Sequence, residues 1–221
     1  MYRYKVNKIW YDDVEIIESE APLSQTEIRN NPLLSNIPGI EERFFEQALV
    51  DIFIGNNDRN NGNWGILRGN ERADRLAPIF DNGGCFLAKA GEEKISSLLN
   101  SAELKNNAIN TLTAYGSKGH QYSAIKFLER TKDEPVMQQA LLAVVPAIRQ
   151  RMDEIADFIY DIPEAVPFGQ SMIPVCSPDR KELYIKHMDI RYQELLYPAY
   201  EKAKEHIQTL QQDKAYDELE L

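Results

Sequence analysis

Three polar side chains in the first third of the sequence have the types and spacing that a phosphoryl-transfer site needs. Asp58 precedes Asn63 by five positions in the run IGNNDRNNGNWGIL, residues 54–67, and Asp81 lies in the run APIFDNGG, residues 77–84. Phosphoryl transfer requires a group that orients the acceptor hydroxyl and takes its proton, and a metal that neutralises phosphate charge. Mg²⁺ prefers hard oxygen ligands and keeps several waters, so one Asn and one Asp suffice to hold it. The pattern is typical of a kinase catalytic loop followed by a metal-binding loop.

The spacing alone is weak evidence, because Asp-x4-Asn occurs by chance in most proteins of this size and Asn/Gly clusters usually mark turns. The combined string is more specific and resembles the HipA family, bacterial serine/threonine kinases best known as toxins of toxin–antitoxin modules. That family has an apolar helix ending in I-G-N-x-D-R-H-x-x-N-W-G, a short hairpin, and then L-A-P-x-(F/Y)-D. The chain departs at Asn60, where the family usually has His. It matches, in order, at Ile54, Gly55, Asn56, Asp58, Arg59, Asn63, Trp64, Gly65, Leu76, Ala77, Pro78, Phe80 and Asp81.

The resemblance implies a role for each matched polar residue. Asp58 and Arg59 would be catalytic, with Asp58 as the base that takes the acceptor proton. Asn56, Asn63 and Asp81 would bind the cofactor, ATP with Mg²⁺. Within that set, Asn63 and Asp81 would be the magnesium ligands. The implied reaction is transfer of the ATP γ-phosphoryl group to a Ser or Thr hydroxyl of a protein.

The segment before the first motif has the pattern of a core-facing helix. Between Ile40 and Ile54, aromatic and aliphatic residues recur at helical spacing with charged residues between them. Gly55 follows directly and can adopt the left-handed conformation that ends many helices. The sequence therefore predicts a helix over 40–54 that delivers the catalytic loop from its carboxyl end.

A short hairpin is expected between the two motifs. Residues 65–67 and 76–80 have the pattern of two strands, and a charged stretch with Gly and Asn joins them. The open end of such a hairpin would bring Asn63 close to Asp81.

The remaining chain is expected to be mostly helical. Asp133 is a candidate cap for a helix that Pro146 would break or restart, and residues 163–167 read as a loop. Ser177 before Pro178 is a strong helix start signal. Helices are predicted over 122–130, 134–145, from 146 to about 159, and from about 179 to beyond 206 with a kink at Pro198. The fold class is therefore mainly α, a protein-kinase-like helical C-terminal lobe with a short β-hairpin carrying the catalytic and metal-binding loops.

The expected organisation is one lobe with two flanking segments. Residues 1–31 would be a remnant of, or hinge to, a nucleotide-clamping N-terminal lobe, 32–207 the kinase lobe, and 208–221 a polar, frayed tail. A complete kinase also needs a Gly-rich turn and a Lys over the phosphates, and Lys5 and Lys8 are the lysines upstream of the catalytic loop. We therefore expect this chain to have little or no kinase activity alone.

Composition favours a cytoplasmic protein. With 35 acidic and 25 basic residues the formal charge is −10, which argues against direct binding to a nucleic-acid backbone. No apolar run approaches the roughly 20 residues of a membrane span, and the amino terminus has no signal-peptide layout. Cys85 and Cys176 are expected to be free and reduced, with Cys85 buried. The three histidines lack metal-ligand spacing, so solvated or helix-face positions are expected.

The partners follow from the resemblance: a protein substrate with a Ser or Thr acceptor, and an antitoxin or a separately encoded N-terminal lobe. An alternative from another class is a noncatalytic, kinase-derived module that binds a partner protein without turnover. The complete set of Asp58, Asn63 and Asp81 favours the enzyme, because a module that only binds has no need of all three.

Overall fold

The computed structural model describes residues 4–6, 9–11, 13–16, 30, 31, 34–59, 63–69, 72–117 and 120–219. The described chain is mainly helical, as predicted, with small antiparallel hairpins. Its helices are α2 (Ile40–Ile54), α3 (Glu92–Leu99), α4 (Leu104–Ile109), α5 (Ala124–Thr131), α6 (Pro135–Asp161), α7 (Pro178–Arg191), the π-helix η2 (Tyr192–Leu196) and α8 (Tyr197–Leu219). Its strands are β1 (Tyr4–Val6), β2 (Ile9–Tyr11), β3 (Asp13–Ile16), β4 (Gly65–Gly69), β5 (Arg72–Leu76), β6 (Leu112–Ser117), β7 (His120–Ser123), β8 (Ala165–Phe168) and β9 (Ser171–Pro174). Among these helices, none has both the length and the apolar character required to cross a bilayer.

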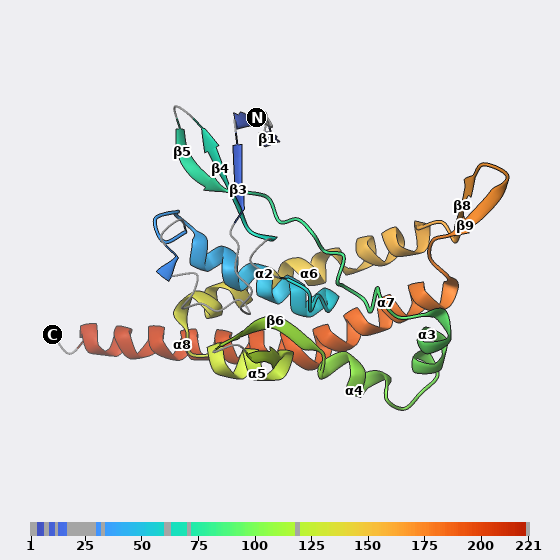
Figure 1. The fold of residues 1–221 in the computed structure, drawn as a ribbon. Coiled ribbons are helices and arrows are strands. Elements are labelled where there is room, and N and C mark those ends of the chain that lie inside the picture. Colours follow the sequence, from blue (N-terminus) through green and yellow to red (C-terminus); the bar gives the residue numbers. More distant parts are fainter. Residues whose placement is uncertain are drawn as a thin grey trace.

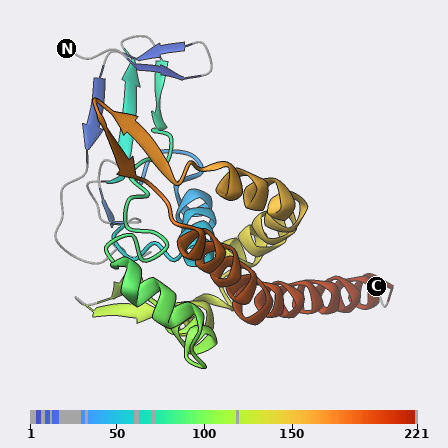
Figure 2. The same ribbon diagram turned by 90° about the vertical axis from the view of Figure 1, so that its right-hand side faces the viewer.

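The strands β3, β4 and β5 stand to one side of the helices in both views (Figures 1 and 2). Helix α2 lies at the centre and packs against α6 and α7. It has the predicted bounds, and Phe44, Phe45 and Leu49 on it are buried. Edge-to-face contact of Phe44 with Tyr115 of β6, at 5.4 Å between ring centroids, fixes the hairpin β6–β7 against the same helix.

Gly55 ends α2 in the predicted left-handed conformation, with φ of 66°. Its N–H donates to the carbonyls of Asp51 and Ile52, and the chain turns from there into the catalytic loop. A Cβ at Gly55 would come within 2.5 Å of Arg191, so glycine is required by contact as well as by φ.

The predicted hairpin is present, but its second strand was placed wrongly. Strand β4 pairs with β5, Arg72–Leu76, and also with β3, which forms a three-stranded antiparallel sheet. Residues 77–80 are not a strand. Pro78 has no N–H for a ladder, and the chain leaves the sheet after Ala77 donates its N–H to the carbonyl of Gly65.

Four local predictions in the middle of the chain were wrong. Helix α6 continues unbroken through Pro146, because Leu141, Val145 and Ile148 around it are buried and their packing outweighs one lost backbone hydrogen bond. The cap position of α6 is Glu134 rather than Asp133. The expected loop over 163–167 and its continuation form the hairpin β8–β9, which projects beyond the carboxyl end of α6 (Figure 1). Helix α5 also begins two residues later than predicted, at Ala124, because the preceding residues pair in β7.

The predicted start of α7 is confirmed: the Ser177 hydroxyl accepts the N–H of Arg180, at 3.2 Å. The expected irregularity near Pro198 takes the form of the π-helix η2, since Pro198 cannot donate to the carbonyl of Glu194. Helix α8 then continues through Leu219, so the segment predicted to fray is helical over its described part.

Candidate phosphoryl-transfer site

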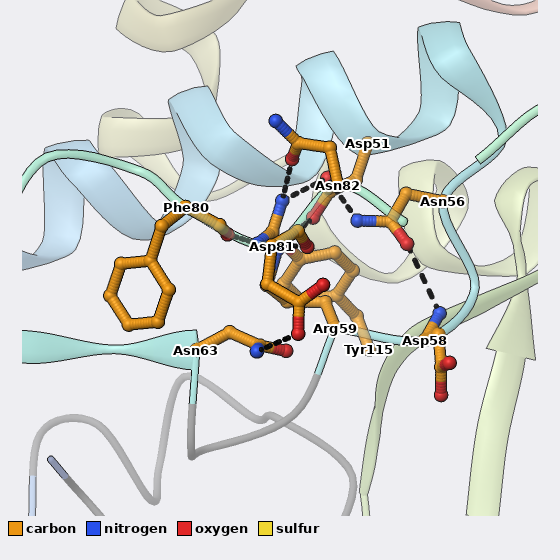
Figure 3. A network of polar contacts seen from close by, with 9 residues as sticks. All are labelled: Asp51, Asn56, Asp58, Arg59, Asn63, Phe80, Asp81, Asn82 and Tyr115. Atoms are coloured by element: carbon orange, nitrogen blue, oxygen red, sulfur yellow. Dashed lines mark hydrogen bonds and ion pairs between the residues drawn. The ribbon is translucent and has the colours of Figure 1, made fainter. Parts of the chain in front are cut away.

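A buried carboxylate at the end of α2 organises the candidate site. Asp51 is 1 % exposed and accepts four hydrogen bonds, shown in Figure 3. Arg59 donates to both of its oxygens, Nε at 3.0 Å and Nη2 at 2.8 Å. Asn56 donates to Oδ1 at 3.0 Å, and the Tyr115 hydroxyl donates to Oδ2 at 2.6 Å. A carboxylate that is removed from water needs hydrogen bonds of this kind on both oxygens.

The guanidinium of Arg59 links the predicted catalytic loop to the predicted metal-binding loop. Besides Asp51, it donates to the carbonyl of Phe80, to the carbonyl of Asp81 at 3.1 Å, and to Oδ1 of Asn82 at 2.6 Å. Its side chain is fully buried. The sequence placed Arg59 among the catalytic groups, and this geometry favours a positioning role for it instead.

Asp58 is positioned from two sides while its carboxylate stays accessible, with a side chain 58 % exposed. Asn56 is 2 % exposed, and its Oδ1 accepts the backbone N–H of Asp58 at 3.2 Å. On the other side lies Gly84, where an added Cβ would come within 2.4 Å of the Asp58 Cβ. Both ends of the Asn56 amide are therefore engaged within the protein, and the geometry favours support of Asp58 over the predicted contact with the cofactor.

The side chains of Asn63 and Asp81 are in contact, as the predicted hairpin led us to expect. The Asn63 side chain donates from Nδ2 to Oδ2 of Asp81 at 2.7 Å, although 18 residues separate them. Asp81 has φ of 56°, a left-handed conformation that Asp tolerates better than most residues. Its carbonyl is held by Arg59, so this conformation is fixed by its surroundings. In Figure 3 the Asn63–Asp81 pair and Asp58 lie on the side of the network away from α2.

The donor set of this pair fits Mg²⁺. Rotation of the Asn63 amide, which is 7 % exposed, would present its oxygen beside the exposed carboxylate of Asp81 and so give two hard oxygen ligands. Mg²⁺ commonly binds one or two protein groups and completes its shell with water and phosphate oxygens. Within the described residues no group of three or more His, Cys, Asp or Glu side chains forms a metal cluster, so a dedicated protein cage is not built there.

The buried side chain of Arg191 lies against the start of the predicted catalytic loop, at Gly55. Arg191 is 1 % exposed and donates from Nε to the carbonyl of Ala108 at 3.0 Å and from Nη2 to the hydroxyl of Thr111 at 3.3 Å. Burial lowers its pKa to about 10. The guanidinium lies against Gly55 at the carboxyl end of α2, where the negative end of the helix dipole favours a cation.

The sequence prediction missed the residues that hold the site together, above all Asp51, Tyr115 and Asn82. Asp51 could have been found, because it continues the buried stripe of Phe44 and Ala48, on a face of the helix where the other buried polar residue is Gln47. A carboxylate in that position needs buried partners. Tyr115 carried no such signal, since its contact with Asp51 spans 64 residues. Burial, with the Asp51 charge beside it, raises the pKa of Tyr115 well above its ordinary value.

The other predictions for reactive side chains had mixed outcomes. Both cysteines are free, Cys176 buried and Cys85 only partly so, which corrects the buried position expected for Cys85. The histidines were expected at solvated or helix-face positions, and His187 lies on the buried face of α7, where it is 1 % exposed. Neither ring nitrogen of His187 has a hydrogen-bond partner. Its desolvation, with the charge of Arg191 nearby, lowers its pKa to about 3.

Comparison with known proteins shows that the chain is similar to a protein kinase. No protein-family model matches the chain. The serine/threonine-protein kinase CtkA of Helicobacter pylori strain J99 is 29 % identical over 146 residues, which are 64 % of this chain and 44 % of CtkA. The chain is homologous to CtkA. A crystal structure of the H. pylori proinflammatory kinase CtkA matches with a TM-score of 0.62 and 27 % identity, covering 74 % of this chain and 54 % of that one. The chain thus spans about half the length of CtkA.

Proposed function

We propose that this chain carries the catalytic, helical lobe of a HipA-like protein serine/threonine kinase. Asp58 is the base, Asn63 and Asp81 hold Mg²⁺, and Asn56 and Arg59 position the loops that present these three side chains. Homology to a serine/threonine kinase supports the reaction class. The identity of these residues with the family pattern supports the assignment of roles.

The proposed reaction is in-line transfer of the ATP γ-phosphoryl group to a Ser or Thr hydroxyl of a protein. The acceptor oxygen forms a bond to the γ-phosphorus while the bond from that phosphorus to the β–γ bridging oxygen breaks, and ADP leaves with the electron pair. Asp58 takes the proton of the hydroxyl. Mg²⁺ held by Asn63 and Asp81 would supply positive charge beside the phosphate oxygens. Arg59 and Asn56 hold the loops that carry the three site residues in position, and they contact no reacting group.

The observation that carries this proposal is the 2.7 Å contact of the Asn63 and Asp81 side chains. This contact joins the two motifs that predicted phosphoryl transfer, although 18 positions separate the residues. Asp58 lies on the same side of the polar network around Asp51 (Figure 3). Such a meeting is expected of a metal-binding pair. Any hairpin would bring the two segments together, so the support comes from the direct contact of an amide with a carboxylate there, near a third polar side chain that matches the family pattern.

Calorimetric titration of the purified chain with ATP tests the proposal. ATP is expected to bind in the presence of Mg²⁺ and to bind much more weakly with EDTA or in an Asp81→Ala variant. Asp133→Ala, which removes an exposed aspartate ahead of α6, is the matched control and is expected to bind as wild type. Equal heats for wild type and Asp81→Ala would contradict the proposal and favour the noncatalytic interaction module.

The remaining assignments extend the same proposal. The acceptor is a Ser or Thr of a protein, the chain acts in the cytoplasm, and an antitoxin or a nucleotide-clamping lobe is its partner. The acceptor and the partner come from the family resemblance, and the cytoplasmic assignment comes from the composition of the sequence. The formal charge of −10 supports a protein over a nucleic acid as the partner.

A further inference from the structure

Lys89 places a positive charge against the proposed base. Its Nζ lies 3.1 Å from Oδ2 of Asp58, although the two residues are 31 positions apart. Both side chains are well exposed, 85 % for Lys89 and 58 % for Asp58. An ion pair this exposed contributes about 0–1 kcal/mol or less to stability, so folding does not account for the contact.

The backbone that carries Lys89 is fixed in an unfavourable conformation. Phe86 and Leu87 have φ of 53° and 55°, a region that non-glycine residues rarely occupy. The conformation persists because the Phe86 N–H donates to the carbonyl of Ile54 at 3.0 Å, and its ring stacks on Tyr184 at 4.6 Å. Strain of this kind is kept where the surroundings over-determine it, and it concentrates at functional sites.

The segment is anchored on the other side of Lys89 as well. Arg180 of α7 donates to the carbonyl of Ala90 at 2.6 Å and forms an ion pair with Glu92, also at 2.6 Å. Lys89 therefore stands between two anchored positions, Phe86 and Ala90. The path of the backbone therefore places Lys89 where its side chain can reach Asp58.

The placement of Lys89 has a consequence for catalysis. If Asp58 takes the proton of the acceptor hydroxyl, a group within hydrogen-bond distance of its carboxylate lies beside the phosphoryl group in transfer. The triphosphate must enter between the carboxylates of Asp58 and Asp81, where negative charges repel it. A lysine ammonium is a compact cation that binds phosphate oxygens well.

We propose that Lys89 is a further catalytic residue, whose ammonium binds the γ-phosphoryl group of ATP. This inference rests on the proposed function and adds a residue to it. When ATP is absent the ammonium pairs with Asp58, and when ATP binds it moves to the γ-phosphate and releases Asp58 to accept the proton.

Comparison of ATP with ADP isolates this contact, because only ATP carries the γ-phosphate. Binding of Mg²⁺-ATP and Mg²⁺-ADP is measured by calorimetry for wild type, Lys89→Met, Lys89→Arg and Lys94→Met. Loss of a charge-assisted hydrogen bond is expected to weaken ATP binding by about tenfold or more in Lys89→Met, with less than about twofold change for ADP. Lys89→Arg is expected to retain most of the ATP affinity. Lys94→Met, an exposed lysine of α3, is the matched control.

The outcomes separate this inference from the proposed function. Unchanged ATP affinity in Lys89→Met, or an equal loss for ATP and ADP, would overturn the role of Lys89 while the proposed function stands. Failure of wild type to bind either nucleotide would overturn both. A selective loss of ATP affinity that arginine restores would establish the contact.

Discussion

Replacement of His187 by Leu is expected to make the protein more resistant to acid. The imidazole of His187 is buried in α7 and has no hydrogen-bond partner on either nitrogen. Burial, together with the charge of Arg191, lowers its pKa from 6.5 to about 3. The folded protein therefore keeps His187 neutral at pH values at which the unfolded chain would protonate it.

The sign and size of the effect follow from proton linkage. Between pH 6.5 and 3 the unfolded state binds more protons at His187 than the folded state, so stability rises with pH in this window and is lost as pH falls. Above pH 6.5 the contribution is constant. At pH 5.0 the free energy of unfolding should be about 2 kcal/mol lower than at pH 7.5 on account of this one group.

Urea denaturation of wild type and His187→Leu at pH 7.5 and 5.0 measures this contribution. At pH 7.5 the variant is expected to equal or exceed the stability of wild type, since no hydrogen bond is lost. At pH 5.0 its advantage should grow by about 2 kcal/mol. His206→Leu, which removes an exposed histidine of α8, controls for the general change in composition. An advantage of His187→Leu that is the same at both pH values would refute the reasoning.

Two further substitutions test how the site is held. In Gly84→Ala the added Cβ would come within 2.4 Å of the Asp58 Cβ and should displace Asp58. Phosphoryl transfer by the chain together with its nucleotide-clamping partner lobe should then fall at least about tenfold, while the far-ultraviolet circular dichroism stays unchanged. Gly83→Ala, where a Cβ meets an atom no nearer than 3.5 Å, is the matched control, and equal activity of the two variants would count against the steric argument. Tyr115→Phe removes a 2.6 Å hydrogen bond to the buried Asp51 and should lower the free energy of unfolding by about 1.5–3 kcal/mol in urea titrations. A loss below about 0.5 kcal/mol would mean that Asp51 does not depend on this donor.

Local pattern was sufficient to predict the parts of the site that adjoin each other in sequence. The bounds of α2 follow from its apolar periodicity, and the left-handed Gly55 follows from the helix ending there. The approach of Asn63 to Asp81 follows from the geometry of any hairpin between them. Each of these features depends on residues within about twenty positions, where spacing decides geometry.

Features that depend on tertiary contact were not predictable from the sequence. Helix α6 passes through Pro146 because α2 and α8 pack on it, a contribution that local propensity does not contain. The hydrogen bond of Tyr115 with Asp51 and the ion pair of Lys89 with Asp58 join segments 64 and 31 residues apart. No periodicity connects such positions.

The central claim is that Asn63 and Asp81 together form a metal site beside Asp58. Crystals of the chain grown with Mn²⁺ and ATP would test it most directly, because anomalous scattering locates the ion. The account predicts a peak at coordination distance, about 2.0–2.2 Å, from the Asp81 carboxylate and the Asn63 amide oxygen, and its absence in Asp81→Ala. An ion bound elsewhere, or no bound ion in crystals that contain ordered ATP, would contradict the account.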